Sequence, residues 1–150
     1  TTARDMGYLA RALIRDFPEY ADFFAVRKLK IGKRVMTNYN RLLRTYEGVD
    51  GMKTGFVCSS GYNIVVSATR GNRKVVAVVL GGLTGSQRNA RAAELLDHGF
   101  RRISWRAFFG KNIDNMTVQA SLTEGAPDLR PTVCGRKRYR KKKKRRAKKR

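Results

Sequence analysis

The sequence GMKTGF, residues 51–56, decides the fold, because it opens the first of three strand-like runs. Each run is rich in β-branched and aromatic residues, and short turns of Ser, Gly and Asn separate one run from the next. Connections this short join antiparallel neighbours, so the sequence predicts a three-stranded antiparallel meander. The runs cover residues 52–58, 62–69 and 74–81.

The last run determines what must surround the sheet. Residues 75–80 are apolar at every position, so this strand presents apolar side chains to both faces, and helices must cover both. One helix is predicted at the N-terminus, capped by Thr1 or Thr2. Another is predicted to begin at Ser86 and to end at Gly99. The predicted fold class is therefore α/β (α+β), an antiparallel sheet flanked by helices.

A basic hairpin and a polar loop precede the central stretch. Residues 26–38 alternate between apolar and polar positions around Gly32, which predicts an exposed ribbon rich in lysine. Residues 38–50 form a polar loop in which Leu42 and Leu43 anchor the chain to the core.

The positive charge is concentrated at the C-terminus. The formal net charge is +23, but residues 136–150 hold 13 of the 34 Lys and Arg residues and no acid. Such a block cannot offset its ordering entropy, so it is predicted to be a disordered polybasic tail. The tail suits nucleic acid or an anionic membrane surface.

Residues 103–135 are predicted to be a poorly defined connector, with one more strand at 115–122. Cys58 and Cys134 lie far apart and lack metal-type spacing, so neither a disulfide framework nor a zinc site is indicated. A single bridge is possible in an oxidising compartment, but two unpaired thiols are favoured. No cofactor or metal is expected.

Five stretches of residues 1–102 stand out for their order and spacing. They are TARDM at 2–6, NYNRLL at 38–43, GVDGMKTG at 48–55, GYN at 61–63 with SA at 67–68, and VAVVLGG at 76–82 followed by LL at 95–96 and GF at 99–100. Together they resemble the C-terminal half of the catalytic domain of a serine-type D-alanyl-D-alanine carboxypeptidase, a low-molecular-mass penicillin-binding protein. The resemblance implies an incomplete β-lactamase/transpeptidase-like fold.

The resemblance also assigns roles within the central stretch. Lys53 and Thr54 would bind the carboxylate of a peptidoglycan stem peptide or of a β-lactam, and Gly55 would keep the cleft open. The backbone N–H of Phe56 would donate to the oxyanion. The family trims the terminal D-alanine through an acyl-enzyme on a Ser-x-x-Lys serine, with a Ser-x-Asn motif nearby. Export to the periplasm or the membrane surface is implied, which makes nucleic acid an unlikely partner and favours an anionic membrane for the tail.

The sequence departs from this family in its serines. The six serines are Ser59, Ser60, Ser67, Ser86, Ser104 and Ser121. None of them has a lysine three residues on or an asparagine two residues on, so the chain is predicted to contain neither the nucleophile nor the base. The chain alone is therefore expected to be inactive. A smaller departure is Tyr39, which stands where some relatives carry a basic residue. The chain begins at Thr1 inside a helix cap, so an earlier segment with a signal peptide is expected to be missing.

Two other functions remain open from the sequence. One is a catalytically silent module that binds peptides or β-lactams, and the other is a basic protein that tethers to a membrane surface. A phosphate-binding loop is not supported, because Met52 stands where that loop needs glycine before the lysine. His98, the sole histidine, is predicted to lie on the surface in the last turn of a helix, where it favours the helix dipole. Asp50 is predicted to fix a turn by bonding its own backbone.

Overall fold

A three-stranded antiparallel sheet forms the centre of the chain. The structure is a computed structural model, and it describes residues 1–106 and 125–135. Strands β3 (Val49–Val57), β4 (Gly61–Arg70) and β5 (Arg73–Gly82) pair in the order β3-β4-β5. This confirms the predicted meander. β3 begins three residues earlier and ends one residue earlier than predicted, while β4 and β5 each extend one residue further at both ends. The predicted strand at 115–122 and the tail at 136–150 lie outside the described residues.

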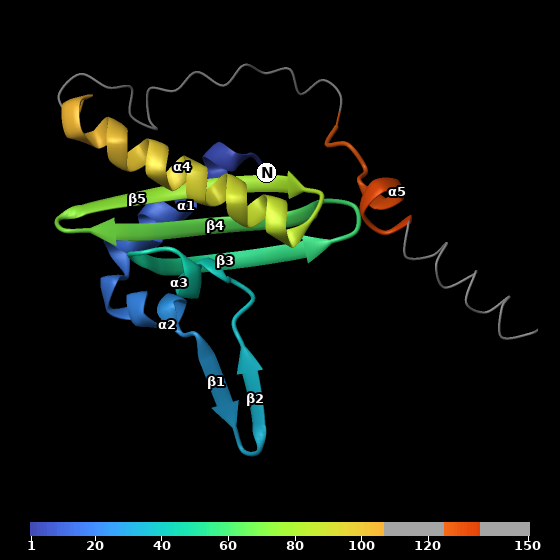
Figure 1. The fold of residues 1–150 in the computed structure, drawn as a ribbon, viewed down its shortest axis with the longest axis horizontal. Helices are drawn as coiled ribbons and strands as arrows, with labels where there is room; N and C mark the ends of the chain where they lie inside the picture. Colours follow the sequence, from blue (N-terminus) through green and yellow to red (C-terminus); the bar gives the residue numbers. More distant parts are fainter. Residues whose placement is uncertain (107–124, 136–150) are drawn as a thin grey trace, which may run out of the picture.

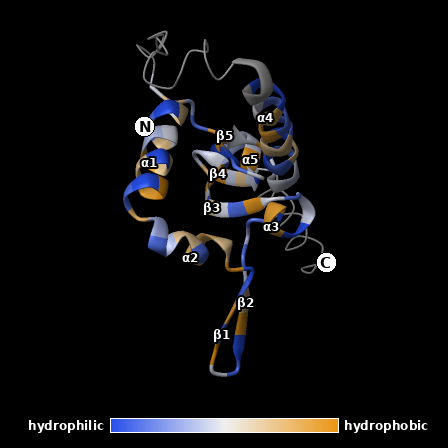
Figure 2. Cartoon of the chain, turned by 90° about the vertical axis from the view of Figure 1, so that its left-hand side faces the viewer, coloured by the Kyte–Doolittle hydropathy of each residue, from blue (hydrophilic) through white to orange (hydrophobic). Residues whose placement is uncertain are grey.

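Helices cover both faces of the sheet, as predicted (Figures 1 and 2). Helix α1 (Ala3–Asp16) begins with a capping box, in which Thr2 and Asp5 each bond the other's backbone N–H. It packs on one face, where the 3₁₀ turn η1 (Pro18–Tyr20) and α2 (Ala21–Ala25) follow it.

Helix α4 (Gly85–Arg106) covers the opposite face, and its buried side chains form the main core with β4 and β5. Its start and end differ from the prediction. The Thr84 hydroxyl, not that of Ser86, accepts a hydrogen bond from a first-turn N–H, that of Gln87. Gly99 does not end the helix but lies within it. A Cβ at this position would lie 2.6 Å from Val75 Cγ1, so the close approach of α4 to β5 requires a glycine here. The glycine serves close packing rather than termination.

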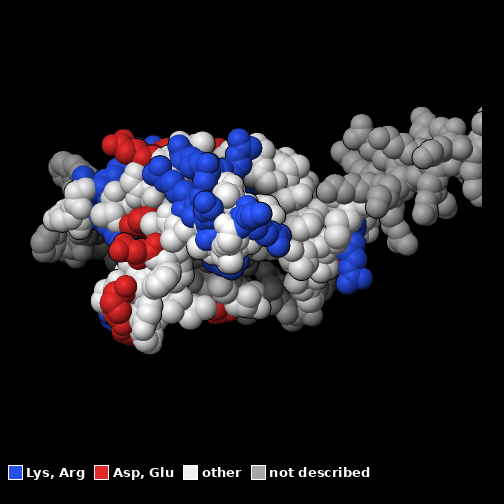
Figure 3. Space-filling view, turned by 90° about the horizontal axis from the view of Figure 1, so that it is seen from below, with Lys and Arg blue, Asp and Glu red and all other residues white. Residues whose placement is uncertain are grey.

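A separate two-stranded hairpin projects from this body (Figures 1 and 2). Its strands are β1 (Lys28–Ile31) and β2 (Arg34–Thr37), and all eight strand residues are exposed, as the prediction of an exposed ribbon requires. Figure 3 looks onto this side of the molecule and shows Lys and Arg side chains gathered there. The chain then enters α3 (Leu42–Thr45), in which Leu42 and Leu43 are buried as predicted.

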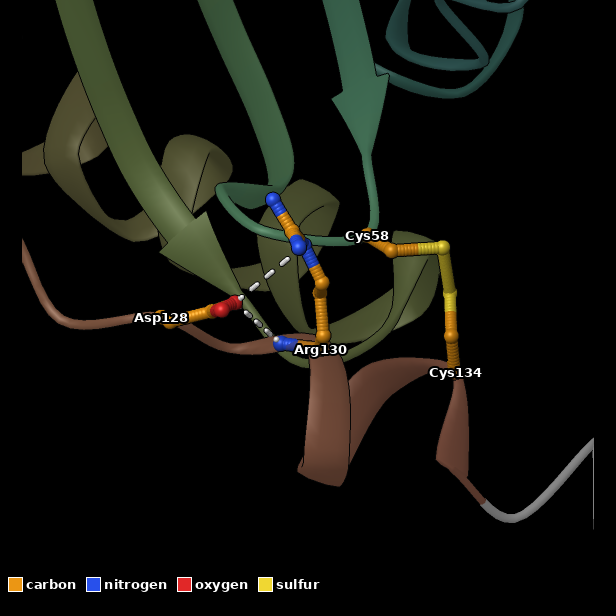
Figure 4. The surroundings of a disulfide bond; sticks show 4 residues. All are labelled: Cys58, Asp128, Arg130 and Cys134. Carbon is orange, nitrogen blue, oxygen red and sulfur yellow. Dashed lines mark hydrogen bonds and ion pairs between the residues drawn. A yellow bond between two sulfur atoms is a disulfide. The ribbon is translucent and has the colours of Figure 1, made fainter.

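The C-terminal described segment is tied to the sheet by a disulfide between Cys58 and Cys134 (Figure 4). The favoured expectation of two unpaired thiols was therefore wrong. The segment contains the short helix α5 (Arg130–Val133), and the N–H of Leu129 donates to the Ser59 carbonyl at 2.9 Å. The pairing was not readable from sequence because only the fold brings these two cysteines together.

The disulfide should contribute measurably to stability. It links positions 76 residues apart, so it restricts the unfolded chain strongly. Replacing both Cys58 and Cys134 by serine is expected to lower the free energy of unfolding by about 2–4 kcal/mol. Urea denaturation of the oxidised protein checks this. Dithiothreitol should destabilise the wild type to the same extent and leave the double variant unchanged; equal stability of all four samples would contradict it.

Candidate functional site

The Lys-Thr-Gly sequence lies in β3, at one edge of the sheet. Among the described residues β3 pairs only with β4, which leaves its other side open. Lys53 is exposed, and its Nζ donates to the Thr54 carbonyl at 3.1 Å. Thr54 is half-buried and Gly55 is exposed, while the ring of Phe56 lies 4.3 Å from that of Tyr62, centroid to centroid. The four residues singled out from sequence therefore follow one another along an open edge.

A cleft of about 590 Å³ lies between this edge and the start of α4, and we call it the basic cleft. Three of its lining residues, Arg41, Lys53 and Arg88, carry positive charge, and none carries negative charge. A site of this composition is suited to a carboxylate. Its lining residues are Tyr39, Arg41, Lys53, Thr54, Gly55, Phe56, Tyr62, Gly85, Ser86, Arg88 and Asn89.

Arg88 is the residue of this cleft that sequence reasoning missed. Its side chain is only 6% exposed, and its guanidinium donates to the Asn89 side-chain oxygen at 3.0 and 2.8 Å. Burial lowers the pKa of Arg88, partly offset by Tyr62. No carboxylate of the described residues forms an ion pair with it. A buried guanidinium without a carboxylate partner is costly, and an anionic ligand would relieve that cost.

A second hollow, of about 610 Å³, touches the same strand, and we call it the apolar hollow. It shares Lys53, Thr54 and Gly55 with the basic cleft. The C-terminal segment that the disulfide links to the sheet forms part of its wall. The Lys-Thr-Gly residues thus border two hollows. The other lining residues are Thr1, Met6, Ser60, Asn63, Ile64, Val65, Leu80, Gly81, Ala126, Pro127 and Leu129.

Asp50 holds the start of β3 against the other two strands. Its carboxylate accepts hydrogen bonds from Ser67 and Thr69 of β4, both at 2.6 Å, and pairs with Lys74 of β5 at 2.8 Å. The prediction that Asp50 bonds its own backbone was wrong. Burial raises the pKa of Asp50, but the bonds from Lys74, Ser67 and Thr69 outweigh it and hold that pKa below its ordinary value of 3.8.

Two asparagine side chains bond backbone groups around the sheet. Asn40 is fully buried, and its side-chain amide donates to the Gly51 carbonyl at 3.0 Å, which fixes the incoming loop against β3. The side-chain oxygen of Asn63 in β4 accepts from the N–H of Gly81 in β5 at 2.8 Å. The first bond therefore holds β3 just before the Lys-Thr-Gly sequence, and the second ties β4 to β5.

Other sequence candidates lie outside both hollows. His98 is exposed on α4, as predicted, but not in its last turn, because the helix continues to Arg106. Within 1–106 and 125–135, no group of three or more His, Cys, Asp or Glu side chains is placed to hold a metal ion. No helix in that part of the chain has the length and hydrophobicity to cross a bilayer.

Comparison with known proteins identifies the family of the chain. The model of the peptidase S11 family, described as D-alanyl-D-alanine carboxypeptidase, matches residues 1–84, more than half of the chain. The chain belongs to the D-alanyl-D-alanine carboxypeptidase family. This confirms the resemblance that the five stretches carry.

Individual relatives show how much of a full-length family member this chain represents. D-alanyl-D-alanine carboxypeptidase DacC of Escherichia coli strain K12 is 43% identical over 102 residues, 67% of this chain and 26% of the relative. Penicillin binding protein 5 from Haemophilus influenzae matches with a TM-score of 0.64 and 37% identity, over 67% of this chain and 30% of that chain. Penicillin-binding protein D2 from Listeria monocytogenes, in the ampicillin bound form, matches with a TM-score of 0.63 and 31% identity, over 67% and 41%.

These matches also confirm the penicillin-binding, transpeptidase-like fold class predicted from sequence. The chain spans between about a quarter and two fifths of the length of the relatives it matches.

The Asp50 network should make stability depend on pH. Asp50→Asn is expected to lower the free energy of unfolding at pH 7 by about 1 kcal/mol, a value discounted for partial exposure. Because the folded pKa of Asp50 lies below the unfolded value, its stabilisation is complete above the ordinary 3.8 and is lost as the pH falls through the lowered folded value. Urea denaturation at pH 7 and at pH 3 measures both effects.

The matched control for this network is Glu47→Gln, which removes an exposed loop carboxylate. It should leave the stability at pH 7 nearly unchanged. If Asp50→Asn and the wild type have the same stability at pH 7, the network does not hold the strands as described.

Proposed function

We propose that the basic cleft binds the C-terminal carboxylate of a D-Ala-D-Ala peptide, as part of a serine-type carboxypeptidase that trims peptidoglycan stem peptides. The observation that carries the proposal is the convergence of Lys53, Thr54 and Arg88 on one cleft, with Arg88 buried and lacking a carboxylate partner among residues 1–106 and 125–135. Lysine supplies a point charge, threonine a hydroxyl and arginine a planar fork of donors. Together they match a terminal carboxylate.

The open edge of β3 supports the same proposal. A peptide can lie beside an unpaired strand and form main-chain hydrogen bonds with it. Gly55, which has no side chain, lets a substrate backbone approach closely, and the N–H of Phe56 is our proposed donor to the developing oxyanion. Substrate binding would thus use main-chain bonds along β3 and the cations of the basic cleft at the carboxylate.

The covalent step needs a nucleophile that this chain does not contain. None of its serines has the Ser-x-x-Lys or Ser-x-Asn pattern. We infer that the chain supplies the carboxylate-binding half of the site, and that a Ser-x-x-Lys serine and its lysine base would come from sequence outside it. The ampicillin-bound state of the Listeria monocytogenes relative supports β-lactams as a second ligand class. An exported location, at the periplasmic or membrane surface, follows from this substrate.

Peptide binding tests the cleft without requiring catalysis. An N-acetylated D-Ala-D-Ala peptide with a free carboxylate is expected to shift the NMR amide signals of residues 53–56, and its C-terminal amide counterpart is not. Lys53→Ala or Arg88→Gln should each weaken binding about tenfold, because each removes a charge-assisted hydrogen bond. Thr54→Val should weaken binding less, because it removes a neutral hydroxyl.

A matched control is Arg73→Gln, which removes an exposed cation at the far end of β5 and should leave the affinity unchanged. Arg88→Lys separates charge from geometry, since it keeps the charge but loses the planar fork. Equal binding of the carboxylate and the amide peptides would rule out carboxylate recognition by this cleft.

The missing nucleophile gives a second prediction. Incubation of the 150-residue chain with benzylpenicillin is expected to leave its intact mass unchanged, because none of its serines has a lysine three residues on to act as the base. Mass spectrometry of the whole protein measures this directly. A stable mass increase of one penicillin would mean that one of its serines is activated after all.

A further inference from the structure

The β1–β2 hairpin is a surface that the carboxylate site does not use. Its base is fixed by two bonds at 2.9 Å, from the Asn38 N–H to the Arg27 carbonyl and from the Asn38 side-chain amide to the Val26 carbonyl. Its tip turns at Gly32, where φ is +58°. Every strand residue beyond the base is exposed, so the hairpin is clamped at one end and open to solvent along its length.

The hairpin exposes four large apolar side chains instead of burying them. The register pairs Leu29 with Met36 and Ile31 with Arg34, which places three apolar side chains and one cation on one face. The exposed fractions are 49% for Leu29, 61% for Ile31, 58% for Val35 and 37% for Met36. An isolated two-stranded ribbon gains little from such residues unless something covers them.

The same ribbon is uniformly positive. Residues 27–37 contain five cations and no acid: Arg27, Lys28, Lys30, Lys33 and Arg34. Figure 3 shows the resulting group of Lys and Arg side chains, with Asp and Glu lying toward one side. This charge disfavours a second copy of the chain as the partner, because edge-to-edge pairing would bring like charges together.

We propose that the β1–β2 hairpin docks onto an anionic lipid bilayer, with Ile31 and its apolar neighbours in the interface and the cations against lipid phosphates. Both chemistries are needed at such a surface: anionic headgroups attract clustered Lys and Arg, and the boundary with the acyl chains accepts apolar side chains. A purely polyanionic partner such as nucleic acid would use the five cations but leave the apolar side chains without a role.

Sedimentation with vesicles of phosphatidylcholine and phosphatidylglycerol tests the docking. Ile31→Ser is expected to reduce the partition coefficient about tenfold, through lost apolar burial. The triple variant Lys28→Gln, Lys30→Gln, Lys33→Gln should reduce it roughly a hundredfold, about fivefold per cation, and the loss should shrink as salt is raised. The binding free energies of independent attachment points add. Attachment through the tail at 136–150 would therefore raise the affinity of every variant, while the fold-change between each variant and the wild type stays the same.

The matched controls are Leu83→Ser, which removes a comparably exposed apolar side chain elsewhere, and Arg73→Gln, which removes an exposed cation outside the hairpin. Both should bind vesicles nearly as the wild type does. Hydrogen exchange of the full chain adds a local readout, in which vesicles should protect the amides of residues 28–37. The hairpin variants should keep the wild-type melting temperature, because the altered side chains lie beyond the clamped base.

Three results would overturn the proposal. In the first, Ile31→Ser binds vesicles as tightly as the wild type. In the second, the full chain binds vesicles while residues 28–37 stay unprotected, which assigns attachment to another part such as the tail. In the third, the triple variant loses affinity for single-stranded RNA but keeps its affinity for vesicles, which assigns the hairpin to nucleic acid.

Discussion

The site depends on a strand that is held from one side only. β3 pairs with β4 and, among the described residues, with no strand on its other edge, so its position rests on that single ladder and on side-chain bonds near its start. The carboxylate of Asp50 supplies the strongest of these, because it binds groups from both β4 and β5. A ligand can then pair with the free edge while the strand itself stays in place.

The electrostatics of the basic cleft follow from the same arrangement. Arg88 comes from α4, whose first turn is set by the Thr84 cap, and Lys53 comes from the edge strand. Two separately positioned elements therefore bring cations to one cleft that contains no acid. Burying Arg88 without a carboxylate lowers the stability of the free protein. The well-packed core between α4 and the sheet, centred on residues such as Leu96 and Val66, offsets that loss.

Sequence reasoning predicted what depends on local pattern. The three strands, the hairpin at Gly32 and the N-terminal cap at Thr2 follow from periodicity, turn residues and capping chemistry, which act over a few positions. Contacts between segments far apart in the sequence leave no local pattern from which they could be predicted. The Cys58–Cys134 pairing, the Asp50 network and the place of Arg88 in the cleft appear only when the strands and α4 are packed together. Gly99 was misread for the same reason, since its contact with Val75 is tertiary.

A chain of hydrogen bonds connects the hairpin to the strand that lines the basic cleft, so the orientation of the hairpin affects the orientation of the cleft. Asn38 closes the base of the hairpin, and its side-chain oxygen accepts from the N–H of Asn40 at 2.9 Å. Asn40 in turn is bonded to the carbonyl of Gly51, which lies in β3 two residues before Lys53. Three consecutive hydrogen-bonded steps thus fix the direction of the ribbon relative to β3. A bilayer bound at the tip would hold the cleft at a set height and angle above the lipid.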